Sequence, residues 1–339
     1  MNSGTITEQS HQTHGKALPI AMLLALATVI PELFAGSTPL VGFLNPGLFF
    51  FLFLGYGVAI LLVRELAVRC RSGMLGLFFL GLAYSIFNEG LLAKTLIIET
   101  NLPVQLYDHY GVLQGTSFPW MAGIGAWHAC ASVLFPILLT HYFFPEVKDE
   151  PWVNGKLASI LGFLLMFLAC VAFLGTSEKG IKGAPGQLVI LLALMLIGFV
   201  LGSLCKGRVS EAALSSAIKP TLFGFSIIVP FWGLALLAAA KVPVAFFFGA
   251  WLAVILVYAW ILKRCQWLAL PNFLFFGVGW YLHNAFQAAI IVSVPGKNPA
   301  RALVTVVVDG LIVFLLVRQI QKRAVRAALK PLTASPLPS

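Results

Sequence analysis

The dominant pattern along this chain is a series of long apolar runs separated by short polar breaks. Runs of about 20 residues with few charges are typical of helices that cross a bilayer core about 30 Å thick. We interpret the runs as ten membrane-spanning helices at residues 17–36, 46–63, 74–98, 118–144, 157–175, 186–204, 221–240, 242–262, 270–293 and 302–317. The polar residues 1–16 before them are expected to form a flexible tail, and residues 318–339 after them a basic tail.

Composition agrees with this pattern. Hydrophobic residues make up 60% of the 339-residue chain and charged residues only 10%. That is too little polar material to cover a soluble globule of this size. We therefore expect an all-α, polytopic transmembrane helix bundle. The net charge of +10 could suggest a nucleic-acid partner, but the basic residues lie in short breaks rather than in one stripe with interleaved aromatic residues. The expected partners are membrane lipids and a membrane-embedded or small-molecule substrate, and no nucleic acid.

The basic residues also predict the orientation of the chain. Lys and Arg of short loops favour the cytoplasmic side of a membrane. If the N-terminus is cytoplasmic, 16 of the 22 Lys and Arg residues face the cytoplasm, five face outward, and Lys94 lies within a span. Both termini are therefore predicted to be cytoplasmic, with the basic tail after Val317 against anionic headgroups.

Candidate chemistry begins with Glu89, in the middle of the third predicted helix and next to Asn88. An ionisable group in hydrocarbon costs at least about 2.5 to 3.5 kcal/mol, so such a residue usually has a function or a partner. At a rise of about 1.5 Å per residue, Glu89 lies about 13 Å below the outer end of its helix, and His128 and His283 lie about 15 Å below the outer ends of theirs. This common depth predicts that the three side chains converge.

The last two predicted helices add further polar groups. Asn284 and Gln287 accompany His283, and Gln287 lies one turn further along the same face. Asp309 lies in the tenth helix, and the same rise places it about 10 Å from the outer end. These side chains are predicted to support the same polar site.

Lys94 follows Glu89 by five residues. Five residues correspond to a rotation of about 140° around a helix, so the two do not form a local ion pair. We expect Lys94 to reach outward to the interface or to meet Asp309 or Glu32 from another helix.

Other polar residues favour structural interpretations. Glu65 is expected to pair with Arg69, its i+4 neighbour, and His109 and His141 are expected to be solvated. The cysteines have no CxxC spacing and are expected to be small apolar filler rather than disulfides or a zinc ribbon. They are Cys70, Cys130, Cys170, Cys205 and Cys265.

A carboxylate and two imidazoles in a partly dry cavity suit a divalent metal, with zinc as the expected ion. His128 and His283 would be the ligands and Glu89 a ligand or general base for hydrolysis within the membrane. Two alternatives stay open. In a proton-coupled transporter, Glu89 and Asp309 would carry protons and a histidine would relay them. In a scaffold without turnover, Glu89 would be a protonated carboxyl bonded across helices.

Two resemblances bear on these alternatives. The order of a Glu helix, a His helix and a later His-Asn helix resembles the CPBP family of intramembrane metalloproteases, which implies zinc, with Glu89, His128 and His283 at the positions of its motif residues. The stretches PELFAGSTPL, GYGVAILLVRELAVR and LGLAYSIFNEGLLAK resemble a group of uncharacterised bacterial polytopic membrane proteins. That second resemblance implies the bacterial inner membrane as the location and supplies no activity.

Overall fold

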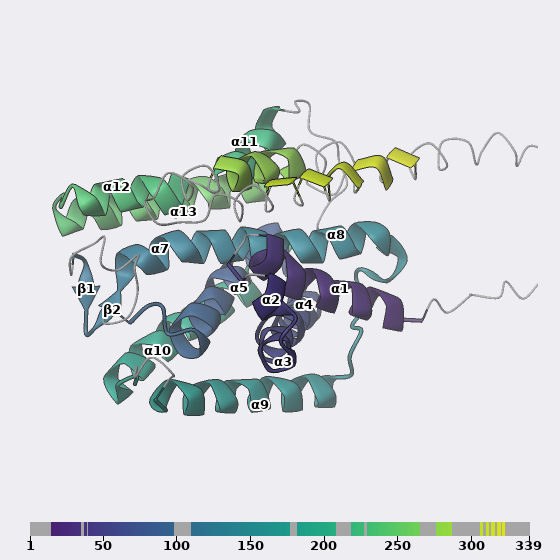
Figure 1. Ribbon diagram of the computed structural model, residues 1–339, viewed down its shortest axis with the longest axis horizontal. Helices are drawn as coiled ribbons and strands as arrows, with labels where there is room; N and C mark the ends of the chain where they lie inside the picture. The colour runs from purple at the N-terminus through teal and green to yellow at the C-terminus, as the bar shows by residue number, and fades with distance from the viewer. Residues whose placement is uncertain are drawn as a thin grey trace, which may run out of the picture.

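A computed structural model describes residues 15–34, 37–38, 40–97, 110–176, 182–207, 218–226, 229–264 and 276–286, together with short helical pieces between residues 306 and 322. The described part is almost entirely helical (Figure 1). Its single sheet is a two-stranded antiparallel hairpin of β1 (Val112–Leu113) and β2 (Thr116–Ser117).

Four helical rods in the first half contain π-helical segments, in which each hydrogen bond spans five residues instead of four. The first rod is α1 (Ala17–Val29) with η1 (Ile30–Phe34), and α2 (Leu40–Phe43) follows it. The other three rods are α3 (Pro46–Leu52), η2 (Phe53–Val58) and α4 (Ala59–Cys70); α5 (Met74–Ser85) and η3 (Ile86–Leu92); and α7 (Phe118–Trp127), η5 (His128–Leu134) and α8 (Phe135–Phe143).

The second half begins with a short 3-10 turn, η6 (Pro145–Val147), and two regular helices of 20 residues each. Its helices are α9 (Gly155–Leu174), α10 (Pro185–Leu204), α11 (Ile218–Ser226), η7 (Val229–Gly233), α12 (Leu234–Ala239) and α13 (Val244–Arg264). Residues 276–286 form a further helix.

Among the described residues, six helices are long and apolar enough to cross a membrane, and Ala17–Glu32 is a shorter apolar helix. Two sequence-based boundaries were wrong. The second span extends to Cys70 instead of stopping at residue 63, because Arg64 and Glu65 are paired and buried inside the helix. The third span ends at Leu92 instead of residue 98, because the backbone turns at Lys94, whose φ is +56°.

The rod α7–η5–α8 lies at the centre of the bundle (Figure 1). The apolar stretch by which it could cross a membrane is completely buried. Close contact with α5 depends on Gly81, because a Cβ atom there would lie 2.5 Å from the Cα of Ala129 in η5. Gly76 of α5 packs as closely on α10, because a Cβ atom there would lie 2.7 Å from the carbonyl oxygen of Gly202. Small residues thus let three helices meet backbone to backbone, as membrane helices often do.

The connections gather at two ends of the bundle. At one end, Lys16 pairs with Glu150 at 3.1 Å, and the Nζ of Lys206 donates to the carbonyl of Cys70 at 2.6 Å. The start of α1 and the last helical pieces before residue 322 lie at this end, on the right in Figure 1.

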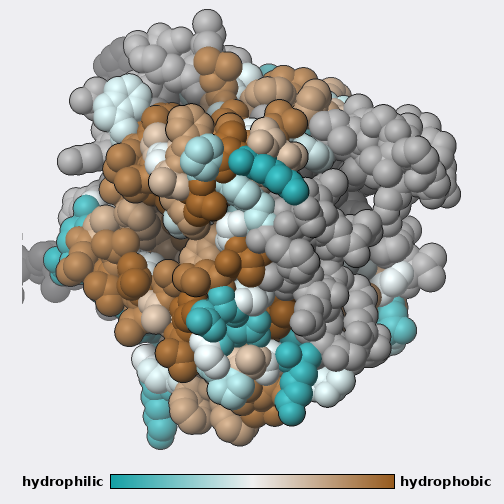
Figure 2. Space-filling model, turned by 90° about the vertical axis from the view of Figure 1, so that its left-hand side faces the viewer, coloured by the Kyte–Doolittle hydropathy of each residue, from teal (hydrophilic) through white to brown (hydrophobic). Residues whose placement is uncertain are grey.

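The opposite end holds the β-hairpin, on the left in Figure 1. There the Tyr110 hydroxyl donates to the carbonyl of Val242 at 2.7 Å, and burial raises the pKa of that phenol. Figure 2 looks onto this end and shows polar residues in separate groups within a largely hydrophobic surface.

Candidate functional site

The candidate site is centred on a hydrogen bond between two buried side chains from different rods. The Oε1 of Glu89, in η3, lies 2.8 Å from the Nε2 of His128, the first residue of η5. Both side chains lie within candidate membrane spans. The contact follows from the tight packing of α5 on η5 at Gly81, two turns before Glu89.

The pair belongs to a longer chain of polar contacts. On one side, the Nδ1 of His128 lies 2.7 Å from the hydroxyl of Ser132, which is fully buried one turn further along η5. On the other side, the Thr95 hydroxyl donates to the second carboxylate oxygen of Glu89, and the Trp120 indole N–H donates to Thr95 at 3.0 Å. The chain therefore runs from partly buried residues beside the hairpin into the centre of the bundle.

A second group of polar side chains surrounds the pair. The Asn88 amide donates to the Tyr56 hydroxyl at 2.8 Å, and the Tyr84 hydroxyl donates to the carbonyl of Gly55 at 3.0 Å. The rings of Tyr56 and Tyr84 lie 6.0 Å and 5.8 Å from the His128 ring. Aromatic walls thus keep the imidazole away from lipid.

Glu32 brings a second carboxylate to this region. It lies in η1, accepts a hydrogen bond from the Thr38 hydroxyl, and is close enough to Glu89 and His128 to interact with their charges. Two carboxylates and one imidazole therefore share this part of the bundle.

Four of the central groups lie on π-helical segments: Glu32 on η1, Tyr56 on η2, Glu89 on η3 and His128 on η5. A π turn adds a residue to the helix and weakens its backbone hydrogen bonds. Such turns are frequent at functional sites. Four π segments thus contribute side chains to one polar cluster, which favours a functional role for the cluster over packing alone.

The other predicted site residues are placed differently. His283 is fully buried in the helix at residues 276–286, and neither of its ring nitrogens has a hydrogen-bond partner among the described residues. It is therefore bonded to neither Glu89 nor His128. Asn284 is buried beside it, whereas Gln287 and Asp309 lie outside the described residues.

Lys94 also differs from its expected role. It lies beyond the end of its helix rather than within a span, and its Nζ donates to the carbonyl of Gly175 at 2.7 Å. Burial lowers the pKa of this ammonium group. Lys94 thus fastens the end of α9 to the turn that carries Thr95.

Within the described part of the chain, no group of three or more His, Cys, Asp and Glu side chains is arranged to hold a metal ion. Both nitrogens of His128 already have partners, Glu89 and Ser132. A catalytic zinc ion needs three protein ligands. In this arrangement the residues do not fit such an ion.

A model of an uncharacterised membrane protein family matches residues 21–317. The chain belongs to that family. Membership agrees with the apolar helices and places the protein in a membrane. No curated protein and no solved structure matches the chain, and the comparisons show no likeness to the CPBP proteases.

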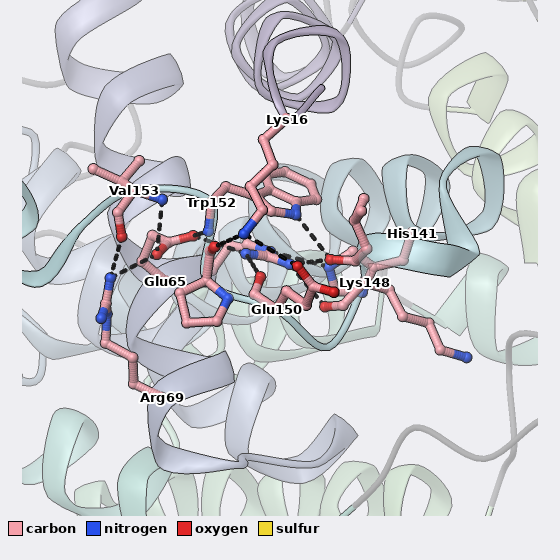
Figure 3. A network of polar contacts seen from close by, with 11 residues as sticks. Lys16, Glu65, Arg69, His141, Lys148, Glu150, Trp152 and Val153 are labelled. Carbon is pink, nitrogen blue, oxygen red and sulfur yellow. Dashed lines mark hydrogen bonds and ion pairs between the residues drawn. The ribbon is translucent and has the colours of Figure 1, made fainter. Parts of the chain in front are cut away.

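A second buried polar network surrounds Arg64 and is shown in Figure 3. The guanidinium donates to Glu65 at 2.7 Å, to the backbone carbonyls of Val147, Lys148 and Glu150, and to His141 at 3.2 Å. It also lies 3.6 Å from the centre of the Trp152 ring.

This network fixes the loop after α8 to α4. The predicted pair of Glu65 with Arg69 is confirmed at 2.9 Å, whereas the expectation of a solvated His141 was wrong because Arg64 and Trp152 bury it. His109, treated in the same way, lies outside the described residues. Because each charged group here has several partners, we interpret the network as structural.

Sequence reasoning missed Thr95, Ser132 and Tyr56 as neighbours of the pair. Ser132 had a detectable signal, because it follows His128 by four residues and shares its helix face. Thr95 had none, because it reaches Glu89 only through the turn at Lys94.

Four described cysteines, Cys70, Cys130, Cys170 and Cys205, are free thiols, and Cys265 lies outside the described residues.

Proposed function

We propose that the protein is a proton-coupled membrane transporter in which Glu89 and His128 bind and release the coupling proton. The observation that carries the proposal is the 2.8 Å hydrogen bond between a carboxylate and an imidazole inside membrane-spanning helices. Chains of Glu and His within a membrane commonly relay protons in pumps and transporters. We place this transporter in the bacterial inner membrane.

The surroundings of the pair favour a proton-binding role. One proton shared by Glu89 and His128 leaves the pair with no net charge, which suits a buried site, and a second proton leaves one positive charge near Glu32. Thr95 and Trp120 extend the chain toward the hairpin end, and Ser132 extends it inward. The weakened ladders of the π segments provide places where the helices can adjust as the charge changes.

Infrared difference spectroscopy of the purified protein, between about pH 4 and pH 9, tests the proton-binding step. We expect a carboxyl band that titrates, disappears in Glu89→Gln and shifts in His128→Gln. Glu146→Gln alters an exposed carboxylate in the loop after α8 and serves as the control. Spectra that Glu89→Gln leaves unchanged would contradict the proposal.

Proteoliposomes with a trapped pH-sensitive dye test transport itself. In a panel of small solutes, the cargo should be the one whose addition moves protons with it, and Glu89→Gln should abolish that movement while Glu146→Gln retains it. Solute uptake that is indifferent to a pH gradient would count against coupling.

An intramembrane metallohydrolase is the second candidate, because Glu89 is a possible general base that lies next to His128. Two further ligands would have to move in; Glu32 lies in the same part of the bundle, and His283 is without a hydrogen-bond partner among the described residues. The discriminating measurement is the zinc content of the purified protein. Near-stoichiometric zinc that is lost in both Glu89→Gln and His128→Ala would favour the hydrolase over the transporter.

A further inference from the structure

A cavity of about 250 Å³ lies between α9 and the helices behind it. Its walls come from α4, α9 and α10, with the Tyr84 and Phe87 side chains at its inner side. The lining includes Leu62, Leu66, Gly162, Met166, Tyr84 and Phe199. Neither Glu89 nor His128 belongs to this lining.

The cavity exists because α9 is attached mainly at its ends. Lys94 holds its last turn through the carbonyl of Gly175, and Arg69 donates to the carbonyl of Val153 just before its first turn. Between these points only Leu165, Ala169 and Phe173 are buried (Figure 1 shows α9 along the edge of the bundle). Gly162 faces α4 without a side chain, which leaves the space open.

The lining selects an apolar ligand. Among its described residues, the hydroxyl of Tyr84 is the single side-chain polar group, and it already donates to the carbonyl of Gly55. A polar ligand would therefore lose its hydrogen bonds to water without replacement. Gly162 lies about 10 Å along α9 from its start, within the depth of the bilayer that contains hydrocarbon chains.

The end of the cavity nearer the polar loops carries positive charge. Lys156 lies about 9 Å before Gly162 on α9, with an exposed side chain, and Arg69, one turn beyond Leu66 on α4, is already paired with Glu65. Both residues lie toward the level of lipid headgroups at the same end. Basic groups at that level attract anionic lipids.

We propose that this cavity binds one acyl chain of an anionic phospholipid, whose headgroup lies at Lys156. The site does not depend on the proposed transport activity. It adjoins the proton pair, however, because Tyr84 lines the cavity and packs on His128 with ring centres 5.8 Å apart. Lipid occupancy would thus support the aromatic wall of the candidate site.

The test uses the full-length protein in vesicles that contain phosphatidylglycerol or phosphatidylcholine with a photoactivatable group on one acyl chain. Cross-linked peptides are mapped by mass spectrometry. We expect phosphatidylglycerol to label α4 and α9 at the cavity, and Gly162→Leu to reduce that labelling several-fold by filling the space. Lys156→Ala should reduce the preference for phosphatidylglycerol over phosphatidylcholine.

Leu164→Phe is the matched control, because it adds bulk to α9 at a side chain that is 47% exposed and does not line the cavity. It should label like the wild type. A Cβ at residue 162 would have its nearest neighbour, Leu62, at 4.0 Å, so the filled variant has room to fold. Equal labelling of Gly162→Leu and wild type would overturn the acyl-chain site, and equal labelling by both phospholipids would overturn the anionic headgroup.

Discussion

At the scale of single residues, the hydroxyl of Ser132 and the hydroxyl of Ser85 offer a direct comparison. Both are buried in membrane-spanning helices, but Ser132 bonds His128 whereas Ser85 has no hydrogen-bond partner in the described part of the chain. Removing one partner of a buried hydrogen bond costs about 1 to 3 kcal/mol, because the other partner stays desolvated. Removing a hydroxyl that bonds nothing has no such cost.

We therefore expect Ser132→Ala to destabilise the protein by about 1 to 3 kcal/mol and Ser85→Ala to be neutral or slightly stabilising. Unfolding of the purified protein in mixed micelles, followed by circular dichroism, gives both free energies. Equal effects of the two substitutions would mean that Ser132 does not hold the imidazole.

Arg64 illustrates a buried charge whose partners are all structural. Its planar guanidinium reaches Glu65, three backbone carbonyls and His141 at once, which the single ammonium of a lysine cannot do. Arg64→Lys should cost about 3 kcal/mol, the order found when a buried ion pair is broken. Arg71→Lys makes the same chemical change at an exposed position and should leave the melting temperature unchanged. A similar loss in both variants would argue against this network.

At the scale of helices, hydropathy predicted several spans almost to the residue. The predicted spans 118–144, 157–175 and 186–204 correspond to Phe118–Phe143, Gly155–Leu174 and Pro185–Leu204. The period and length of an apolar run determine these boundaries. The end at Leu92 could not be predicted in this way, because residues 95–98 are as apolar as the helix before them.

The depth of a residue along its helix predicts its level in the membrane but not which other side chains it touches. The shared level of Glu89 and His128 suggested that they could meet, and the close packing of Gly81 on Ala129 brings them together. The same argument applied to His283, which bonds neither of them. Which helices are neighbours depends on small residues facing each other across the bundle, and a single sequence does not reveal that pairing. The π segments likewise left no pattern in the sequence.

The packing of α5 on η5 leads to a prediction about the candidate site. A methyl group at Gly81 would lie 2.5 Å from the Cα of Ala129, so Gly81→Ala must separate the two helices. Overpacking of this kind costs about 1 to 3 kcal/mol, and it should also break the bond between Glu89 and His128. The infrared carboxyl band of Glu89 is then expected to shift.

Gly125→Ala is the control for this prediction. Gly125 lies on the same pair of rods, but a Cβ there would meet only Leu82 at 3.5 Å and Ser85 at 3.9 Å, which are ordinary contacts. Stability and the carboxyl band should therefore stay as in the wild type. If Gly81→Ala behaves like Gly125→Ala, the site does not depend on this contact.

At the scale of the whole molecule, the two ends of the bundle differ in charge. The end with Lys16, Arg71, Lys148 and Lys206 carries more basic residues than the end with the β-hairpin. The positive-inside tendency therefore predicts that the first end faces the cytoplasm and the hairpin faces outward. In that orientation, the partly buried residues Thr95 and Trp120 lie on the outer side of the proton pair.

Single-cysteine variants test this orientation on a background without the five native cysteines. Leu113→Cys lies in the hairpin, where Leu113 is 57% exposed, and Glu146→Cys lies in the exposed loop after α8. In intact cells, a membrane-impermeant maleimide should label residue 113 alone, and residue 146 should react only after the membrane is opened. The reverse pattern would invert the bundle and make Thr95 and Trp120 the cytoplasmic end of the proton path. Labelling therefore decides from which side protons would reach Glu89, because the chain of contacts extends to the hairpin end through Thr95 and inward through Ser132.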